Sequence, residues 1–154
     1  MDAWKKDRIG AALKGENPTV ICRMKSGFAV IGDTQFLPGY CVLLGYPEVN
    51  SLNDLDVEKR KDFLLDMSLL GDAIMEVCKP LKVNYEILGN TDAYLHAHVF
   101  PRYEWEGERR KYPVWLYPKE NWSIAEYQFS DEKHGALKKQ LSLKLQQLMQ
   151  IYYR

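Results

Sequence analysis

Two of the three histidines in this 154-residue chain lie two positions apart, at His96 and His98. Residues 93–100 are expected to form a strand. Side chains alternate between the two faces of a strand, so both imidazoles point the same way, with Cα atoms roughly 6.5–7 Å apart. Tyr94 and Phe100 share their face, and the opposite face carries small or apolar residues, as a core requires: Leu95, Ala97 and Val99. Two imidazoles at this spacing can flank a phosphate group.

A phosphate held by this pair could be attacked directly. A neutral imidazole is a nucleophile towards phosphorus, and an imidazole with an ordinary pKa near ~6.5 is largely neutral at pH 7. Attack on a nucleotide would give a nucleotidyl-imidazole that water or another acceptor could take apart. The second imidazole, if protonated, could stabilise the phosphoryl oxygens or the leaving group.

Two other interpretations of the pair stay open. The histidines could be structural, or they could bind a metal, for which structural zinc needs four ligands and catalytic zinc three. His134 is the only other histidine, near the start of the last expected helix, and no cysteine or carboxylate has the spacing of an obvious third ligand.

The neighbouring residues favour phosphate chemistry. Gly89, Asn90 and Thr91 come just before the strand. Glycine permits a tight turn with free backbone N–H groups, and the next two side chains add donors, so the segment is a plausible anion site facing the histidines. Arg102, just after the strand, could supply a fixed positive charge to the same site.

This segment resembles the signature of the histidine triad superfamily of nucleotide hydrolases and transferases. His96 and His98 match the last two histidines of the motif, and Pro101-Arg102 matches its tail. Gly89-Asn90-Thr91 falls where the family has Gly-Gln-Ser or Gly-Gln-Thr. The stretch from Asp33 to Leu44 resembles the nucleoside-side loop and the strand after it, and Pro113-Val114-Trp115 resembles a segment of a bacterial branch. The likeness covers roughly residues 18–115, and it departs at the first histidine position, where this chain has Tyr94.

The resemblance implies a role for each matching residue. His96 is the nucleophile that takes the α-phosphate, and His98 contacts phosphate or assists the leaving group. The remaining positions are implied to bind or brace the substrate: Gly89, Asn90, Thr91, Asp33, Asn84, Tyr94 and Arg102. It also implies catalysis without a metal or other cofactor, and many relatives form homodimers.

The elements expected to position these residues follow from hydrophobic spacing. Apolar residues recur in steps of three and four over 57–78, which predicts a long helix with Asp56 at its start and Pro80 after its end. Helices are also expected over 2–14 and 131–152, with strands at 19–22, 28–31, 40–44 and 83–88 and irregular structure from 101 to 130. The last helix carries a stripe that suits either its own core or a partner: Leu137, Leu141, Leu145, Leu148 and Tyr152.

The predicted fold is α+β, in one domain over 1–154 with a core of about 18–115 and a helical extension at about 131–152. The resemblance supplies its form: an antiparallel sheet of about five strands with a long packed helix. Composition agrees with a globular domain, at 46% hydrophobic and 27% charged residues. A net charge of +0 argues against a general nucleic-acid binder.

The chain is expected to be cytoplasmic. Its three cysteines are odd in number with no Cys-x-x-Cys pair, and its first residues do not resemble a signal peptide. No apolar run approaches the ~20 residues that span a bilayer, so no membrane association is expected.

The expected function is a nucleotide hydrolase or nucleotidyl transferase acting on dinucleoside polyphosphates such as diadenosine tetraphosphate, or on related conjugates. The alternatives are a non-catalytic nucleotide-binding or regulatory protein of the same fold and, third, a metal-dependent hydrolase that uses His96 and His98 as ligands.

Overall fold

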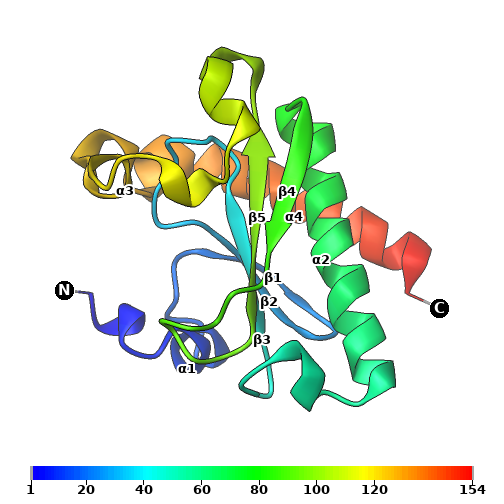
Figure 1. Ribbon diagram of the computed structural model, residues 1–154. Helices are drawn as coiled ribbons and strands as arrows, with labels where there is room; N and C mark the ends of the chain where they lie inside the picture. The colour runs from blue at the N-terminus through cyan, green and yellow to red at the C-terminus, as the bar shows by residue number, and fades with distance from the viewer. Residues whose placement is uncertain (1, 154) are drawn as a thin grey trace.

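The computed structural model describes residues 2–153 and centres on a five-stranded antiparallel sheet (Figure 1). The strand order across the sheet is β1-β2-β3-β5-β4, and β4 pairs only with β5. The strand bounds are Val20–Met24 for β1, Gly27–Ile31 for β2, Cys41–Gly45 for β3, Lys82–Glu86 for β4 and His96–Arg102 for β5. This arrangement confirms the expected α+β fold.

The two long helices, α2 and α4, pack on one face of the sheet, while the short helix α1 lies on the other (Figure 1). The segment after β5 also covers that second face, through 3₁₀ turns and the short helix α3. The helix bounds are Arg8–Leu13 for α1, Val57–Cys78 for α2, Glu120–Ser123 for α3 and Asp131–Tyr152 for α4. One face therefore carries the main core, and the other is partly open.

Helix α2 has the bounds that its apolar spacing predicts. The side chain of Asp56 accepts a hydrogen bond from the Lys59 amide at 2.9 Å, which caps the first turn. The helix ends at Cys78, and Lys79 caps it with a left-handed φ of 53° before Pro80. Phe63, Leu70 and Ile74 are fully buried against the sheet, and Met67 and Val77 are partly buried at the edge of the same cluster.

We expect Leu70→Ala to reduce the free energy of unfolding by about 2–5 kcal/mol, because it leaves a cavity in a fully buried position. Leu64→Ala is the matched control in the same helix. Leu64 is 39% exposed, so its loss should stay within about 1 kcal/mol. Urea unfolding measures both values, and equal losses would contradict this packing.

Helix α4 belongs to the core of its own chain. Leu141 and Leu145 are fully buried with α2 and the sheet, and Leu137 and Leu148 pack at the edge of the same cluster. Tyr152, the last member of the stripe, is 54% exposed. Beyond it, Tyr153 donates a hydrogen bond to the buried carboxylate Asp66, which ties the end of α4 to α2.

The ends of β1 to β4 lie within two residues of the sequence expectation, and two other elements depart further from it. The helix expected over 2–14 is divided into a 3₁₀ turn at Ala3–Lys5 and α1, because the Asp7 side chain accepts from the Gly10 amide and starts a new helix. The strand expected over 93–100 begins later, at His96, and continues to Arg102. Its pairing with β3 ends at Val99, so the ring of Pro101 interrupts no ladder on that side.

Among residues 2–153, no helix is both long enough and apolar enough to cross a membrane.

Candidate functional site

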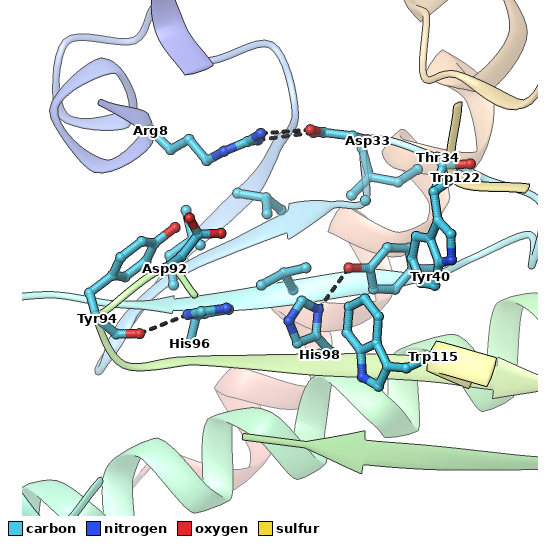
Figure 2. Close-up of a pocket in the computed structure, with 15 residues that line it drawn as sticks. Arg8, Asp33, Thr34, Tyr40, Asp92, Tyr94, His96, His98, Trp115 and Trp122 are labelled. Atoms are coloured by element: carbon cyan, nitrogen blue, oxygen red, sulfur yellow. Dashed lines mark hydrogen bonds and ion pairs between the residues drawn. The ribbon is translucent and has the colours of Figure 1, made fainter. Parts of the chain in front are cut away.

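His96 and His98 open onto a cavity of about 260 Å³ on the sheet face opposite α2 (Figure 2). Its floor comes from β2, β3 and β5, and one wall comes from α1 and the residues after β2. The polar residues around it include Arg8, Asp33 and Tyr40. Both imidazoles therefore reach a hollow of the surface from the middle of the sheet.

The two imidazoles lie side by side, as the alternation of the strand predicts. Their ring centroids are 4.9 Å apart, with planes at 76°. Nδ1 of His96 is 2.7 Å from the backbone carbonyl oxygen of Tyr94 (Figure 2). A carbonyl can only accept, so in the neutral imidazole Nδ1 carries the proton and Nε2 keeps its lone pair. His96 thus has the tautomer that a nucleophile needs.

His98 is not the protonated imidazole that the sequence analysis considered for stabilising the phosphoryl oxygens. Burial, and next the neighbouring His96, lowers the pKa of His98 to about 4, so this imidazole is neutral at pH 7. Its Nδ1 is 2.7 Å from the hydroxyl of Tyr40 (Figure 2). In the free protein His98 can offer a hydrogen bond to a phosphate, but it brings no positive charge.

The loop before β5 borders a second cavity of about 440 Å³, which the two histidines share. Gly89, Asn90 and Thr91 all line it, so the structure brings these predicted residues to the histidine pair. Gly89 has a φ of 70°, a left-handed conformation that glycine adopts without strain. The loop can therefore present amide and hydroxyl groups on the side of the histidines away from Asp33.

Asp33 lines the first cavity, where it is held by a residue that the sequence analysis did not select. The guanidinium of Arg8, on α1, donates to both carboxylate oxygens at 2.9 and 2.6 Å (Figure 2). Such a bidentate pair fixes the plane of the carboxylate. No sequence pattern links these two residues, since they lie 25 positions apart and meet only through the packing of α1.

Tyr94 lines the first cavity, but it precedes β5 instead of belonging to it. Its ring centroid is 4.8 Å from that of His96, and its carbonyl is the acceptor described above. Tyr94, which stands at the first histidine position of the motif, therefore contacts His96 through both its ring and its backbone.

Arg102 and Asn84 line neither cavity, contrary to the expectation that they serve the site. The Arg102 side chain is 2% exposed and donates to Glu106 at 3.0 Å and to Asn84 Oδ1 at 2.9 Å. It also donates to the carbonyl oxygens of Tyr112 and Arg109. The chain turns back after β5 and places a carboxylate over the guanidinium, so Arg102 fastens that segment.

Two tryptophans of the segment after β5 border the first cavity and were not among the predicted residues. Trp115 and Trp122 stack with centroids 4.7 Å apart and planes at 10°. Trp115 also meets the ring of His98 edge-on at 4.9 Å and borders the second cavity. The two aromatic rings therefore restrict the space on one side of His98.

Within residues 2–153, no three histidine, cysteine, aspartate or glutamate side chains gather closely enough to hold a metal ion. His134 is on α4, where its Nδ1 accepts from the Ser130 amide. The histidine pair therefore has no third ligand of these residue types beside it among the described residues.

No protein-family model matches this sequence, and no curated protein sequence is significantly similar to it. Solved structures do match. A histidine triad protein from Marinobacter aquaeolei VT8 has 23% identity and a TM-score of 0.66, over 84% of this chain and 89% of that chain. A hypothetical histidine triad nucleotide-binding protein from Sulfolobus tokodaii has 14% identity and a TM-score of 0.68, over 92% of this chain and 93% of that chain.

A diadenosine triphosphate hydrolase from Plasmodium falciparum also matches, with 15% identity and a TM-score of 0.56, over 88% of this chain and 79% of that chain. All three identities are below 25%, so what they establish is the fold. The chain has the histidine triad fold, as its sequence motif indicated.

Proposed function

We propose that this protein is a nucleotide hydrolase or nucleotidyl transferase that works through a covalent intermediate on His96. The observation that carries the proposal is the 2.7 Å contact between Nδ1 of His96 and the Tyr94 carbonyl oxygen, which puts the proton of the neutral ring on Nδ1 and leaves Nε2 unprotonated at the cavity. Among structures of this fold, one is a diadenosine triphosphate hydrolase. Dinucleoside polyphosphates, such as diadenosine tetraphosphate, are the first substrate class that we propose.

The proposed reaction is a double displacement. Nε2 of His96 attacks the α-phosphorus, the P–N bond forms, and the P–O bond to the leaving group breaks. The resulting nucleotidyl-imidazolium is stabilised by the Tyr94 carbonyl, which accepts from its Nδ1–H. Water or another acceptor then attacks phosphorus, the electron pair of the P–N bond returns to Nε2, and the proton of the attacking water goes to solvent.

The two cavities suggest where the two parts of such a substrate bind. The first combines apolar side chains of β2 and β3, such as Val30 and Val42, with the carboxylate of Asp33, which suits a nucleoside. Arg8 takes one hydrogen-bonding position on each oxygen of Asp33, and a carboxylate has about four, so ribose hydroxyls can still donate to it. The second cavity, with Gly89, Asn90 and Thr91, is proposed to take the leaving phosphates.

The test is incubation with a panel of nucleoside polyphosphates and nucleoside phosphate conjugates in the presence of a strong chelator. Nucleoside monophosphate should accumulate, and calorimetry should detect nucleotide binding. Tight binding without product after long incubation would favour the non-catalytic alternative. Activity that the chelator abolishes would favour the metal-dependent one.

We also propose that the protein is a homodimer. Strand β4 is an edge of the sheet, and Leu81, Tyr85 and Leu88, in or beside it, are 41–53% exposed. Light scattering should give twice the 18.0 kDa of one chain. A single-chain mass at micromolar concentration would contradict this assignment without affecting the chemistry of His96.

A further inference from the structure

Tyr40 is held firmly against His98, although no motif singles it out. Its side chain is buried, and its hydroxyl is 2.7 Å from Nδ1 of His98. The ring stacks on Phe100 with centroids 4.5 Å apart. The Tyr40 carbonyl accepts from the Gly32 amide at 2.8 Å and from Nε2 of Gln35 at 2.9 Å. Backbone and ring are both fixed, so the hydroxyl has a defined position relative to the imidazole.

The direction of this hydrogen bond decides where His98 carries its proton. A neutral imidazole has one N–H, and a tyrosine hydroxyl can donate or accept. The hydrogen-bonding partner that the structure gives the Tyr40 hydroxyl is Nδ1 of His98. If the hydroxyl donates there, the imidazole proton must be on Nε2. The reverse direction would turn a lone pair of Nε2 towards any bound phosphate, which repels it.

We propose that Tyr40 is a positioning residue whose hydroxyl donates to Nδ1 of His98 and fixes the proton of that imidazole on Nε2. The two neighbouring histidines then hold opposite tautomers: the Tyr94 carbonyl keeps Nε2 of His96 unprotonated, while Tyr40 keeps Nε2 of His98 protonated. His96 is able to attack phosphorus, and His98 is able to donate to a phosphoryl or leaving oxygen.

Burial, and not the carboxylates near His98, sets the pKa of this imidazole. Tyr40, His96 and Asp92 line the first cavity beside it, and Glu86 is its partner across β4 and β5. Burial lowers the pKa of His98, and burial raises the pKa of Tyr40, so both groups keep these protonation states around pH 7. The Glu86 carboxylate accepts from the indole N–H of Trp115.

The proposed tautomer of His98 limits the class of leaving group, and this step of the inference rests on the proposed function. A neutral Nε2–H can stabilise an oxyanion, but its transfer would leave an imidazolate, or a buried tyrosinate if the Tyr40 proton followed. No proton is needed when a phosphoanhydride breaks, because the phosphate departs as a stable anion. An amine must gain a proton as its P–N bond breaks. The site therefore favours phosphoanhydrides over phosphoramidates of the same nucleotide.

Imidazole ¹⁵N chemical shifts of the free, full-length protein at pH 7 test the tautomer directly. Only three histidines contribute, and His134→Gln and His96→Asn assign the signals. We expect Nε2 of His98 to be protonated and Nδ1 to be unprotonated. Tyr40→Phe should move the proton wholly or partly to Nδ1. Tyr85→Phe, which removes a hydroxyl from the neighbouring strand β4, should change neither signal.

A wild-type His98 with its proton on Nδ1 would overturn the inference, and this result needs no variant to fold. In the kinetic arm, Tyr40→Phe should lower kcat on a dinucleoside polyphosphate by about 10- to 100-fold with KM little changed, as for other groups that hold a catalytic histidine in its tautomer. An unchanged kcat would also overturn it. Faster turnover of a phosphoramidate than of a phosphoanhydride with the same nucleoside would overturn the leaving-group assignment.

The inference and the proposed function fail separately. If His98 has the proposed tautomer but no nucleotide is turned over, the proposed function is overturned and the role of Tyr40 as hydrogen-bond donor to His98 still stands. Turnover through His96 with the His98 proton on Nδ1 overturns the inference and leaves the proposed function.

Discussion

Glu106→Ala is expected to lower the free energy of unfolding by about 3–5 kcal/mol. The side chains of Arg102 and Glu106 are 2% and 0% exposed, so the substitution leaves a buried guanidinium without its counter-charge. The Glu106 carboxylate also accepts from the Tyr103 amide and from the Tyr117 hydroxyl, and both donors lose their acceptor.

Glu108→Ala is the matched control, two residues away in the same 3₁₀ segment, Glu104–Lys111. Glu108 pairs with Lys111 on the surface, where both side chains are more than 60% exposed, and exposed pairs contribute about 0–1 kcal/mol. Urea unfolding measures both variants. Near-UV circular dichroism should also change for Glu106→Ala alone, because Arg102 holds the segment that carries Trp115. Equal stability losses would contradict the buried pair.

His96→Asn is expected to reduce turnover of a nucleoside polyphosphate by at least about 10³-fold, because asparagine has no nitrogen lone pair to attack phosphorus. The substitution keeps a polar side chain of similar reach in a position that is 6% exposed, so folding should survive. Product formation by chromatography gives the rate, and thermal unfolding checks the fold.

His134→Asn is the control for loss of an imidazole. His134 is on α4 and lines neither of the two cavities beside His96. The turnover of the His134→Asn variant should equal that of the wild-type protein. If His96→Asn kept more than about a tenth of the activity, the assignment of the nucleophile would be wrong.

Much of the fold follows from local patterns in the sequence. Helix α2 begins after Asp56 and ends before Pro80 because a side-chain cap and a proline act within a few residues of each end. Alternation along the strand places His96 and His98 on one face for the same reason, since only local geometry is involved. Only the structure decides whether Leu141 and Leu145 pack in the core or at an interface, because an apolar stripe on a helix does not show which surface it packs against.

The site was less predictable where contacts join distant segments. Arg102 was expected to face the phosphate because it follows the motif. Glu106 instead pairs with Arg102, after a turn in the chain that the hydrophobic pattern does not predict. Tyr40 has the pattern of one more apolar position in the strand expected over 40–44, and its contact with His98 spans 58 positions. Arg8 reaches Asp33 only because Asp7 starts a new helix at that point.

The most direct test of the central claim is the mass of the intact protein during turnover. The protein is mixed with a nucleoside polyphosphate in chelator, quenched in base, in which a phosphorus–imidazole bond survives, and measured at once. We predict a mass increase of one nucleoside monophosphoryl group, mapped to His96 and missing from His96→Asn. Product that accumulates with no adduct, or an adduct on another residue, would contradict it.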